Sequence, residues 1–357
     1  MKRISPSAGA LAELADPEFS ATVIRWQRQH GRHALPWQNT TDAYRIWLSE
    51  IMLQQTQVVA VIPYYQRFLQ RFPDVAALAA APVEEVMAYW SGLGYYSRAR
   101  NLHRCAQQVV AECAGVFPAD PARLAELPGI GRSTAAAIAA FSHGARAAIL
   151  DGNVKRVFAR VFGIDAYPGE KKIELAMWRR ADALLPDERQ HGAMVAYTQG
   201  LMDLGATVCS RSRPACADCP LRERCVAHRD GRVHELPARK PKKTTPEKHA
   251  AMLVVIDDGE VLLQQRPASG IWGGLLSLPE IEGFTAQPTQ VSEPAIAQTL
   301  ADVGVLAESA SMPTLAHGFT HFRLHIAPYR VRLQKRLYLA AQSGYVWLPL
   351  ARLQAAP

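Results

Sequence analysis

Four of the six cysteines lie close together, and their spacing is the most specific chemical signal in the sequence. Cys209, Cys216, Cys219 and Cys225 follow the pattern C-x6-C-x2-C-x5-C. Four thiolates this close together are typical of a metal centre. A structural zinc ion is one interpretation. We favour a [4Fe–4S] cluster, because the ligands lie in a single compact loop rather than in two separated knuckles.

Two carboxyl groups lie in patterns that suit proton transfer and charge stabilisation. Glu50 shares a predicted helical face with Ile46 and Leu53, which form part of an apolar stripe. Burial on that face would raise the pKa of a carboxyl and make it a proton donor near neutral pH. At the edge of the stripe it would instead cap a backbone group or pair with an arginine. Asp151 precedes a helical pattern at 154–164, so it is either an N-cap or a carboxylate aimed into a cleft.

A glycine-containing turn at 127–134 (LPGIGRST) is expected to join two helices, 122–127 and 132–141. Gly129 and Gly131 permit positive φ and a close approach of another backbone. The amides of the turn and the start of the second helix would attract an anion, and a phosphate diester is the natural choice in a basic protein. An ordinary corner between two helices is the alternative.

Aromatic, amide and basic side chains that suit nucleic acid contacts lie on two further segments. The loop 91–100 carries Tyr95 and Arg98, which suit stacking on bases and pairing with phosphates. A helix C-cap followed by core aromatics is the other interpretation of this loop. Gln54 and Gln55 have uncharged amides, which contact bases and backbone equally well and therefore select neither reading.

The periodicity of apolar residues changes once along the chain. Helical patterns cover 19–31, 44–61, 63–71, 82–90, 154–164, 170–185 and 190–205. Strand patterns follow in a hairpin at 250–266 and at 322–333 and 345–350, with one helix near 294–303. We therefore expect a multidomain protein with an all-α domain at 18–228, a basic proline-containing linker at 229–248 and an α+β domain at 249–357.

Composition and charge limit the kinds of partner and cellular location that the chain can have. The 357 residues are 49% hydrophobic and 20% charged, and the net charge is +8. This balance favours an acidic partner, nucleic acid before a membrane. No apolar run is long enough for a membrane-spanning helix, and the small polar residues near the N-terminus argue against a signal peptide. We expect a monomer in the cytoplasm, associated with the nucleoid if the protein is bacterial, where the reducing setting keeps thiolates free.

In this order and combination, the segments resemble the adenine DNA glycosylases of the MutY type over nearly the whole chain. The matching segments are LPWQ (35–38), WLSEIMLQQTQV (47–58), GLGYYSRARNLH (92–103), LPGIGRSTA (127–135), ILDGNVKR (149–156), MDLGA (202–206), the four-cysteine loop and GIWGGL (270–275). The resemblance implies a helix-hairpin-helix glycosylase domain of two helical subdomains with a DNA-binding cleft. It also implies a [4Fe–4S] cluster on the four cysteines and a C-terminal Nudix-like domain.

The C-terminal domain departs from the enzymes of the Nudix fold. Those enzymes hydrolyse nucleoside diphosphate compounds with a glutamate-rich REXXEE helix, whereas the corresponding stretch here holds only Glu293 and Asp302. The resemblance therefore implies a recognition module for 8-oxoguanine opposite the target adenine. The family's Phe-Ser-His loop reads Phe319-Thr320-His321 in this chain, and the added methyl group alters the contact geometry.

The resemblance implies a mechanism as well. Adenine opposite 8-oxoguanine or guanine is flipped out of double-stranded DNA while Gln54 and Tyr95 probe or wedge the duplex. Glu50 protonates adenine N7, and ionised Asp151 stabilises the oxocarbenium character of the sugar, with Asn153 orienting these groups. Water completes the hydrolysis, either directly or after a covalent adduct with Asp151.

Further positions follow from the same resemblance. Trp37, Gln38 and Gln199 are expected to line the adenine pocket, although a core tryptophan at a helix entry also explains Trp37. Endonuclease III-like relatives carry a lysine nucleophile where Ser133 stands, and that lysine forms a Schiff base and cuts the strand. Ser133 therefore implies a monofunctional glycosylase.

Three rival functions have different signatures. A bifunctional pyrimidine glycosylase-lyase is disfavoured by Ser133 and by the extra C-terminal domain. A nucleotide-hydrolysing Nudix enzyme is disfavoured by the missing acidic residues. A non-catalytic iron–sulfur DNA-binding protein is disfavoured by the presence of both Glu50 and Asp151.

Overall fold

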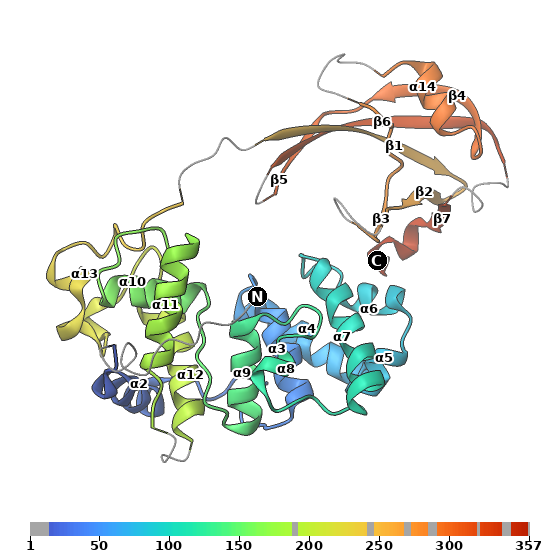
Figure 1. The fold of residues 1–357 in the computed structure, drawn as a ribbon. Coiled ribbons are helices and arrows are strands. Elements are labelled where there is room, and N and C mark those ends of the chain that lie inside the picture. The colour runs from blue at the N-terminus through green and yellow to red at the C-terminus, as the bar shows by residue number, and fades with distance from the viewer. Residues whose placement is uncertain are drawn as a thin grey trace. The chain divides into compact units, whose positions relative to one another are not determined.

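The computed structural model describes residues 14–187, 192–240, 246–267, 273–284, 291–319, 322–337 and 344–355 (Figure 1). The chain divides into two compact units, which are Met1–Pro82 with Arg98–Pro241 and Val83–Ser97 with Lys242–Pro357. The described part of the first unit is helical, and the second unit carries the sheet. The segment Val83–Ser97, which holds α6 (Val83–Trp90), therefore groups with the second unit although its sequence pattern is helical.

The helices of the first unit are joined mostly by short turns. In chain order they are α2 (Pro17–His30), α3 (Ala43–Leu53), α4 (Val58–Arg71), α5 (Val75–Ala80), α7 (Ser97–Cys113), α8 (Pro121–Leu124), α9 (Arg132–His143), α10 (Gly152–Val161), α11 (Lys171–Ala183), α12 (Ala193–Asp203) and α13 (Val226–Arg229). Five of them begin at an aspartate whose carboxylate accepts a main-chain N–H of the first turn, namely Asp16, Asp42, Asp74, Asp120 and Asp151. These carboxylates satisfy N–H groups that the first turn of a helix leaves without a partner.

The apolar pattern at 44–61 forms parts of two helices, and the single helix that its periodicity predicts is wrong. Helix α3 ends at Leu53 and α4 begins at Val58. Between them the backbone of Gln55 takes a φ of 59°, in the left-handed region that ends a helix. Apolar residues continue at helical spacing across this break, so the pattern alone does not reveal it. The short helix α5 is also missing from the prediction.

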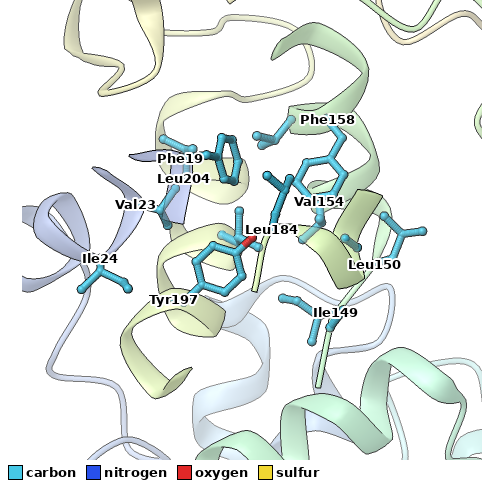
Figure 2. Packing of buried hydrophobic residues seen from close by; sticks show 14 of the residues in the cluster. Phe19, Val23, Ile24, Ile149, Leu150, Val154, Phe158, Leu184, Tyr197 and Leu204 are labelled. Carbon is cyan, nitrogen blue, oxygen red and sulfur yellow. The ribbon is translucent and has the colours of Figure 1, made fainter. Parts of the chain in front are cut away.

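A buried core holds the segment that leads to Asp151. The core packs Phe19 of α2, Phe158 of α10 and Tyr197 of α12 together, and the rings of Phe19 and Phe158 meet edge to face at 6.0 Å. Ile149 and Leu150 belong to the same cluster, as Figure 2 shows. Burying these two side chains places the next residue, Asp151, at the surface of a packed core rather than in a loose loop.

The second unit contains a mixed sheet, which confirms the predicted α+β class for this part. Its strands are β1 (Glu247–Asp257), β2 (Glu260–Gln265), β3 (Leu276–Ser277), β4 (Gly304–Ser311), β5 (Leu315–Gly318), β6 (Arg323–Arg336) and β7 (Tyr345–Pro349), and α14 (Glu293–Thr299) is its helix after β3. The strand order is β3-β2-β1-β6-β4, with β5 on β6 and β7 on β2. Strands β1 and β6 run parallel along nine residue pairs.

The hairpin that the sequence predicts in this unit is present. Asp257 pairs with Glu260 across Asp258 and Gly259, which both have positive φ, as a tight turn between right-twisted strands requires. In the described residues of both units, no helix has the length and apolar character that crossing a membrane requires.

Candidate active site

Glu50 lies on α3 in surroundings that favour its neutral form. Its neighbours Ser49 and Ile51 are buried, and Glu50 itself is partly buried. Burial, and next the charge of Asp151, raise the pKa of Glu50 to about 8. Within the described residues, its carboxyl makes no hydrogen bond or ion pair that would favour the ionised form. Glu50 is therefore protonated at neutral pH and able to act as an acid.

Asp151 lies at the N-terminus of α10, where hydrogen-bond donors and basic residues act on its carboxyl. Its Oδ1 accepts a hydrogen bond of 2.8 Å from the N–H of Val154. Burial raises the pKa of Asp151, while the N–H groups of Val154 and Asn153 and the charges of Arg156 and Lys155 oppose that rise. The start of a helix also favours a negative charge. These donors and charges favour the ionised form of Asp151, whereas no such group acts on Glu50 among the described residues.

A hydrogen-bond network connects the start of α10 to the cysteine loop. Arg156 Nη2 donates to Asn153 Oδ1 and to the carbonyl of Gly205, both at 2.7 Å, and Arg156 Nε donates to the carbonyl of Cys209 at 2.8 Å. A Cβ on Gly205 would lie 2.5 Å from the Asn153 Cβ, so only glycine permits this approach. Gly205 lies in a π-helical turn (Leu204–Val208), a conformation that recurs at functional sites.

The basic residues near the start of α10, Lys155 and Arg156, have partners within the protein. Lys155 Nζ lies 2.6 Å from Glu174 Oε1, and Arg156 is used in the network above. An external anion is therefore not needed to explain cations at the start of a helix.

Ser133 connects the hairpin to the segment that ends at Asp151. Its hydroxyl accepts a hydrogen bond of 3.0 Å from the N–H of Leu150. In the turn before it, Gly129 has a φ of 78°, and a Cβ there would lie 2.9 Å from the Cβ of Asn101. Gly131 has a φ of −89° and open space around it, so the expectation of positive φ holds for Gly129 alone. At Gly131 the glycine leaves room for a backbone to approach from outside.

Arg98 is not a DNA contact, because its side chain is buried at the end of α3. It is 7% exposed, and its Nη1 donates to the carbonyls of Ile51, Met52 and Gln54 at 2.7–3.1 Å. Its Nη2 donates to Thr56 Oγ1 at 3.1 Å. Arg98 thus satisfies the carbonyls that a helix end leaves unpaired and fixes the turn that follows. This capping is the physical reason for the break in the predicted helix.

Of the remaining candidates for probing the duplex, Gln55 and Tyr95 are exposed and have left-handed backbone, whereas Gln54 has neither property. Gln54 is half-buried, and its Nε2 lies 3.4 Å from Thr134 Oγ1. Gln55 is exposed with a φ of 59°. Tyr95 is 44% exposed with a φ of 49°. Left-handed backbone at non-glycine residues is costly and concentrates at functional sites.

Two residues that sequence reasoning missed, Arg32 and Asp203, bring Gln38 and Gln199 into one network. Asp203 is fully buried and accepts hydrogen bonds from the N–H and Nε of Arg32, at 2.9 and 2.7 Å, and from Gln199 Nε2 at 2.8 Å. Gln38 Nε2 donates to the Arg32 carbonyl at 2.9 Å. Trp37 is 8% exposed and meets the Tyr65 ring edge to face, as a core tryptophan does. Asp203 lies in the MDLGA segment (202–206), so the resemblance of that segment to the family was the sequence signal that could have identified it.

The four cysteines line one pocket, together with Arg160 and Leu221 among others. Main-chain N–H groups of Leu221 donate to the Cys219 sulfur, and those of Ala227 and His228 donate to the Cys225 sulfur. Arg160 Nη1 lies 3.3 Å from Cys209 Sγ. In the described part of the chain, no three His, Cys, Asp or Glu side chains converge as ligands of one metal ion.

Only part of the predicted recognition loop of the second unit can be located. Phe319 stacks on Phe322 with ring centroids 4.4 Å apart, and His317 meets the Phe319 ring at 4.7 Å. Thr320 and His321 lie outside the described residues.

Comparison with known proteins shows which class of protein this fold belongs to. Residues 48–182 match the family of HhH-GPD superfamily base excision DNA repair proteins, and residues 250–357 match the NUDIX domain family. The solved structure of a thermostable thymine-DNA glycosylase is similar, with a TM-score of 0.54 and 27% identity over 63% of this chain and 99% of that chain. The fold is thus that of a helix-hairpin-helix DNA repair glycosylase followed by a Nudix-like domain.

The family within this class follows from two relatives. An adenine DNA glycosylase of Buchnera aphidicola subsp. Acyrthosiphon pisum (strain APS) is 35% identical, covering 88% of this chain and 87% of its own. The adenine DNA glycosylase of Mus musculus is 34% identical, covering 92% and 73%. The chain belongs to the adenine DNA glycosylase family, base excision repair enzymes that hydrolyse N-glycosyl bonds. The resemblance found in the sequence is confirmed.

The raised pKa of Glu50 predicts a pH-dependent stability difference between wild type and Glu50→Gln. Between pH 4.5 and about 8 the unfolded chain ionises Glu50 while the folded chain keeps it neutral. As the pH rises through this range, the free energy of unfolding of the wild type therefore falls, whereas that of Glu50→Gln does not change through this group. The melting temperature of the wild type should fall relative to that of the variant. Thermal unfolding at pH 5.5 and 8.5 measures this difference in melting temperature, and Glu112→Gln, at an exposed glutamate, is the control. An equal difference at both pH values would refute the raised pKa.

Removing the Arg98 side chain is predicted to destabilise the helical unit strongly. Arg98→Ala leaves several carbonyls at the end of α3 without their donor, which costs about 3 kcal/mol. The control Arg104→Ala removes an exposed arginine of the same helix and should cost under about 0.5 kcal/mol. Denaturant unfolding compares the two, and similar midpoints would show that Arg98 does not cap the helix.

Proposed function

We propose that this protein removes adenine paired with 8-oxoguanine or guanine from duplex DNA, and that it does so without cutting the strand. The observation that carries the proposal is the pair Glu50 and Asp151, of which Asp151 alone has N–H donors and basic residues that favour its ionised form. A protonated carboxyl beside an ionised one is what acid-assisted cleavage of a glycosidic bond needs.

The proposed reaction begins with adenine flipped out of the stack. The neutral Glu50 carboxyl donates its proton to adenine N7, so that the base leaves as a neutral molecule when the bond from C1′ to N9 breaks. The sugar then carries positive charge, which the ionised Asp151 carboxylate stabilises. Asn153 keeps the start of α10 in place through Arg156. Addition of water to C1′ completes the hydrolysis.

The proposed DNA contacts use the exposed residues of the helical turns. Gln54, Gln55 and Tyr95 would probe the duplex while the target base is extruded. The open space around Gly131 and the free N-terminal end of α9 suit a phosphate of the backbone. The network of Arg32, Asp203 and Gln199 supports the adjacent adenine pocket.

The proposal that the enzyme is monofunctional depends on Ser133. A lyase step of the Schiff-base type needs an amine at this position, whereas the Ser133 hydroxyl is used to accept a hydrogen bond from Leu150. No nucleophilic amine therefore stands at the position that the related lyases use.

We further propose a [4Fe–4S] cluster as the group on Cys209, Cys216, Cys219 and Cys225. Zinc needs all four sulfurs about 2.3 Å from one centre, whereas a cluster spreads its thiolates over separate irons. The four cysteines line one shared pocket, and the N–H donors to Cys219 and Cys225 suit thiolates. When bound, the cluster would cross-link the loop and give it a fixed shape.

The second unit is proposed to recognise the base opposite adenine. Glu293 and Asp302 alone do not form the acidic metal site of a Nudix hydrolase, so a binding role is favoured. Phe319, stacked on Phe322, offers an apolar surface at the start of the proposed 8-oxoguanine loop. We also propose that the protein acts as a monomer in the cytoplasm, where reduced thiols persist.

Single-turnover release of adenine opposite 8-oxoguanine tests the proposed function. Wild type should produce strand breaks only after alkali treatment. Glu50→Gln should lower the rate about 1,000-fold, because the proton donor is lost. Each pH unit above about 8 should lower the wild-type rate tenfold as Glu50 loses its proton. Strand breaks without alkali would contradict monofunctional action, and intact adenine in a protein that binds the duplex would favour the non-catalytic alternative.

The two hairpin glycines are predicted to have separable effects. Gly129→Ala forces a side chain into a left-handed backbone and against Asn101, which costs about 2 kcal/mol of stability. Gly131→Ala meets no protein atom and should leave stability within about 0.5 kcal/mol. Its methyl group should nevertheless weaken duplex binding several-fold by blocking the phosphate. Denaturant unfolding compares the stability of the two variants, and titration with duplex DNA compares their binding. Unchanged binding in Gly131→Ala would exclude this phosphate site.

A further inference from the structure

Arg160 of α10 is a buried cation, and no carboxylate of the described residues pairs with it. Its relative exposure is 2%, and none of the ion pairs among the described residues includes it. Burying an arginine unpaired is costly, so buried arginines normally have an anionic partner. The mechanism proposed above gives Arg160 no role. Its surroundings therefore need a separate explanation.

The contacts of the guanidinium all lie at the two ends of the cysteine loop. Arg160 Nη1 donates to the Ser210 carbonyl at 2.7 Å and Nη2 to the Arg211 carbonyl at 3.2 Å, both just after the first cysteine. Arg160 Nε donates to the Leu236 carbonyl at 2.8 Å, beyond the last cysteine. One side chain thus closes the segment from 209 to 236 on itself.

The same residue touches the first and the last cysteine. Its Nη1 lies 3.3 Å from Cys209 Sγ, and its main-chain carbonyl lies 3.4 Å from Cys225 Sγ. Arg160 also lines the pocket that the four cysteines share. The neighbouring Arg156 adds a second positive charge rather than cancelling the first. Only the cysteine sulfurs are available as an anionic partner within this set of contacts.

We propose that Arg160 is the built-in counter-cation of the thiolate metal centre and the clamp that holds the two ends of its loop together. This inference rests on the proposed metal centre on the four cysteines. Four thiolates give a cluster or a zinc ion a net negative charge, which a buried guanidinium balances. Hydrogen bonds and charge at ligating sulfurs also set a cluster's reduction potential. Arg160 is thus a positioning residue with two separable effects, one from its charge and one from its forked shape.

Two variants separate these effects. Arg160→Gln removes the charge and most of the donors, so metal per protein should fall several-fold, and the reduction potential of the remaining cluster should become more negative. Arg160→Lys keeps the charge, but a single nitrogen cannot reach carbonyls on both sides of the loop. It should keep a potential close to that of wild type, while the loop becomes several-fold more sensitive to limited proteolysis.

The experiment uses the full chain as purified, with iron and zinc content, the visible absorption spectrum and the reduction potential as readouts. Arg211→Gln, an exposed arginine of the same loop, is the control for nonspecific loss of positive charge. Wild-type metal content and potential in a folded Arg160→Gln variant would overturn the proposal. Equal losses in Arg211→Gln would also overturn it, because the effect would then not be specific to the buried position.

The outcome distinguishes this inference from the proposals on which it depends. Wild type with zinc in place of iron would contradict the cluster, and loss of that zinc in Arg160→Gln would still support Arg160 as the counter-cation. Wild type with neither metal would overturn both. Adenine release by wild type is measured separately, so an inactive protein with an Arg160-dependent metal centre would contradict only the proposed function.

Discussion

Two carboxyl groups that share one desolvated site cannot both ionise, and the helical unit is arranged around this constraint. Glu50 lies on α3 and Asp151 at the start of α10, and the charge of Asp151 acts on Glu50. Main-chain N–H groups and two basic residues act on Asp151, whereas burial is the main influence on Glu50. In the proposed mechanism this difference holds the proton on Glu50 and gives the two carboxyls different chemical roles.

Three further contacts keep the pair in register. Ser133 ties the hairpin to Leu150, next to Asp151, and Arg98 fixes the end of the helix that carries Glu50. Arg156 joins the start of α10 to the backbone at Gly205 and Cys209. Because these contacts come from distant parts of the chain, disturbing the hairpin or the cysteine loop should reach the carboxyls without touching them directly.

The sequence is sufficient for features that depend on neighbouring residues. The N-cap at Asp151, the strand hairpin at Asp258 and the placement of Glu50 on an apolar face all follow from local patterns. Features that depend on long-range partners were not predictable. The break after Leu53 is made by Arg98, more than forty positions away, and the Arg32–Asp203 pair joins residues 171 positions apart. No periodicity records such pairings, because they exist only once the helices have packed.

Titration of the Glu50 carboxyl in the free protein would show whether this group holds a proton at neutral pH. Carbon-13 NMR of carboxyl-labelled glutamate can follow it, with Glu50→Gln to assign the signal. We expect a carboxyl that titrates near pH 8 in wild type and at a lower pH in Asp151→Asn, where the neighbouring charge is gone. A Glu50 signal that titrates in the ordinary range of an exposed glutamate would show that the folded protein does not hold this carboxyl in its neutral form.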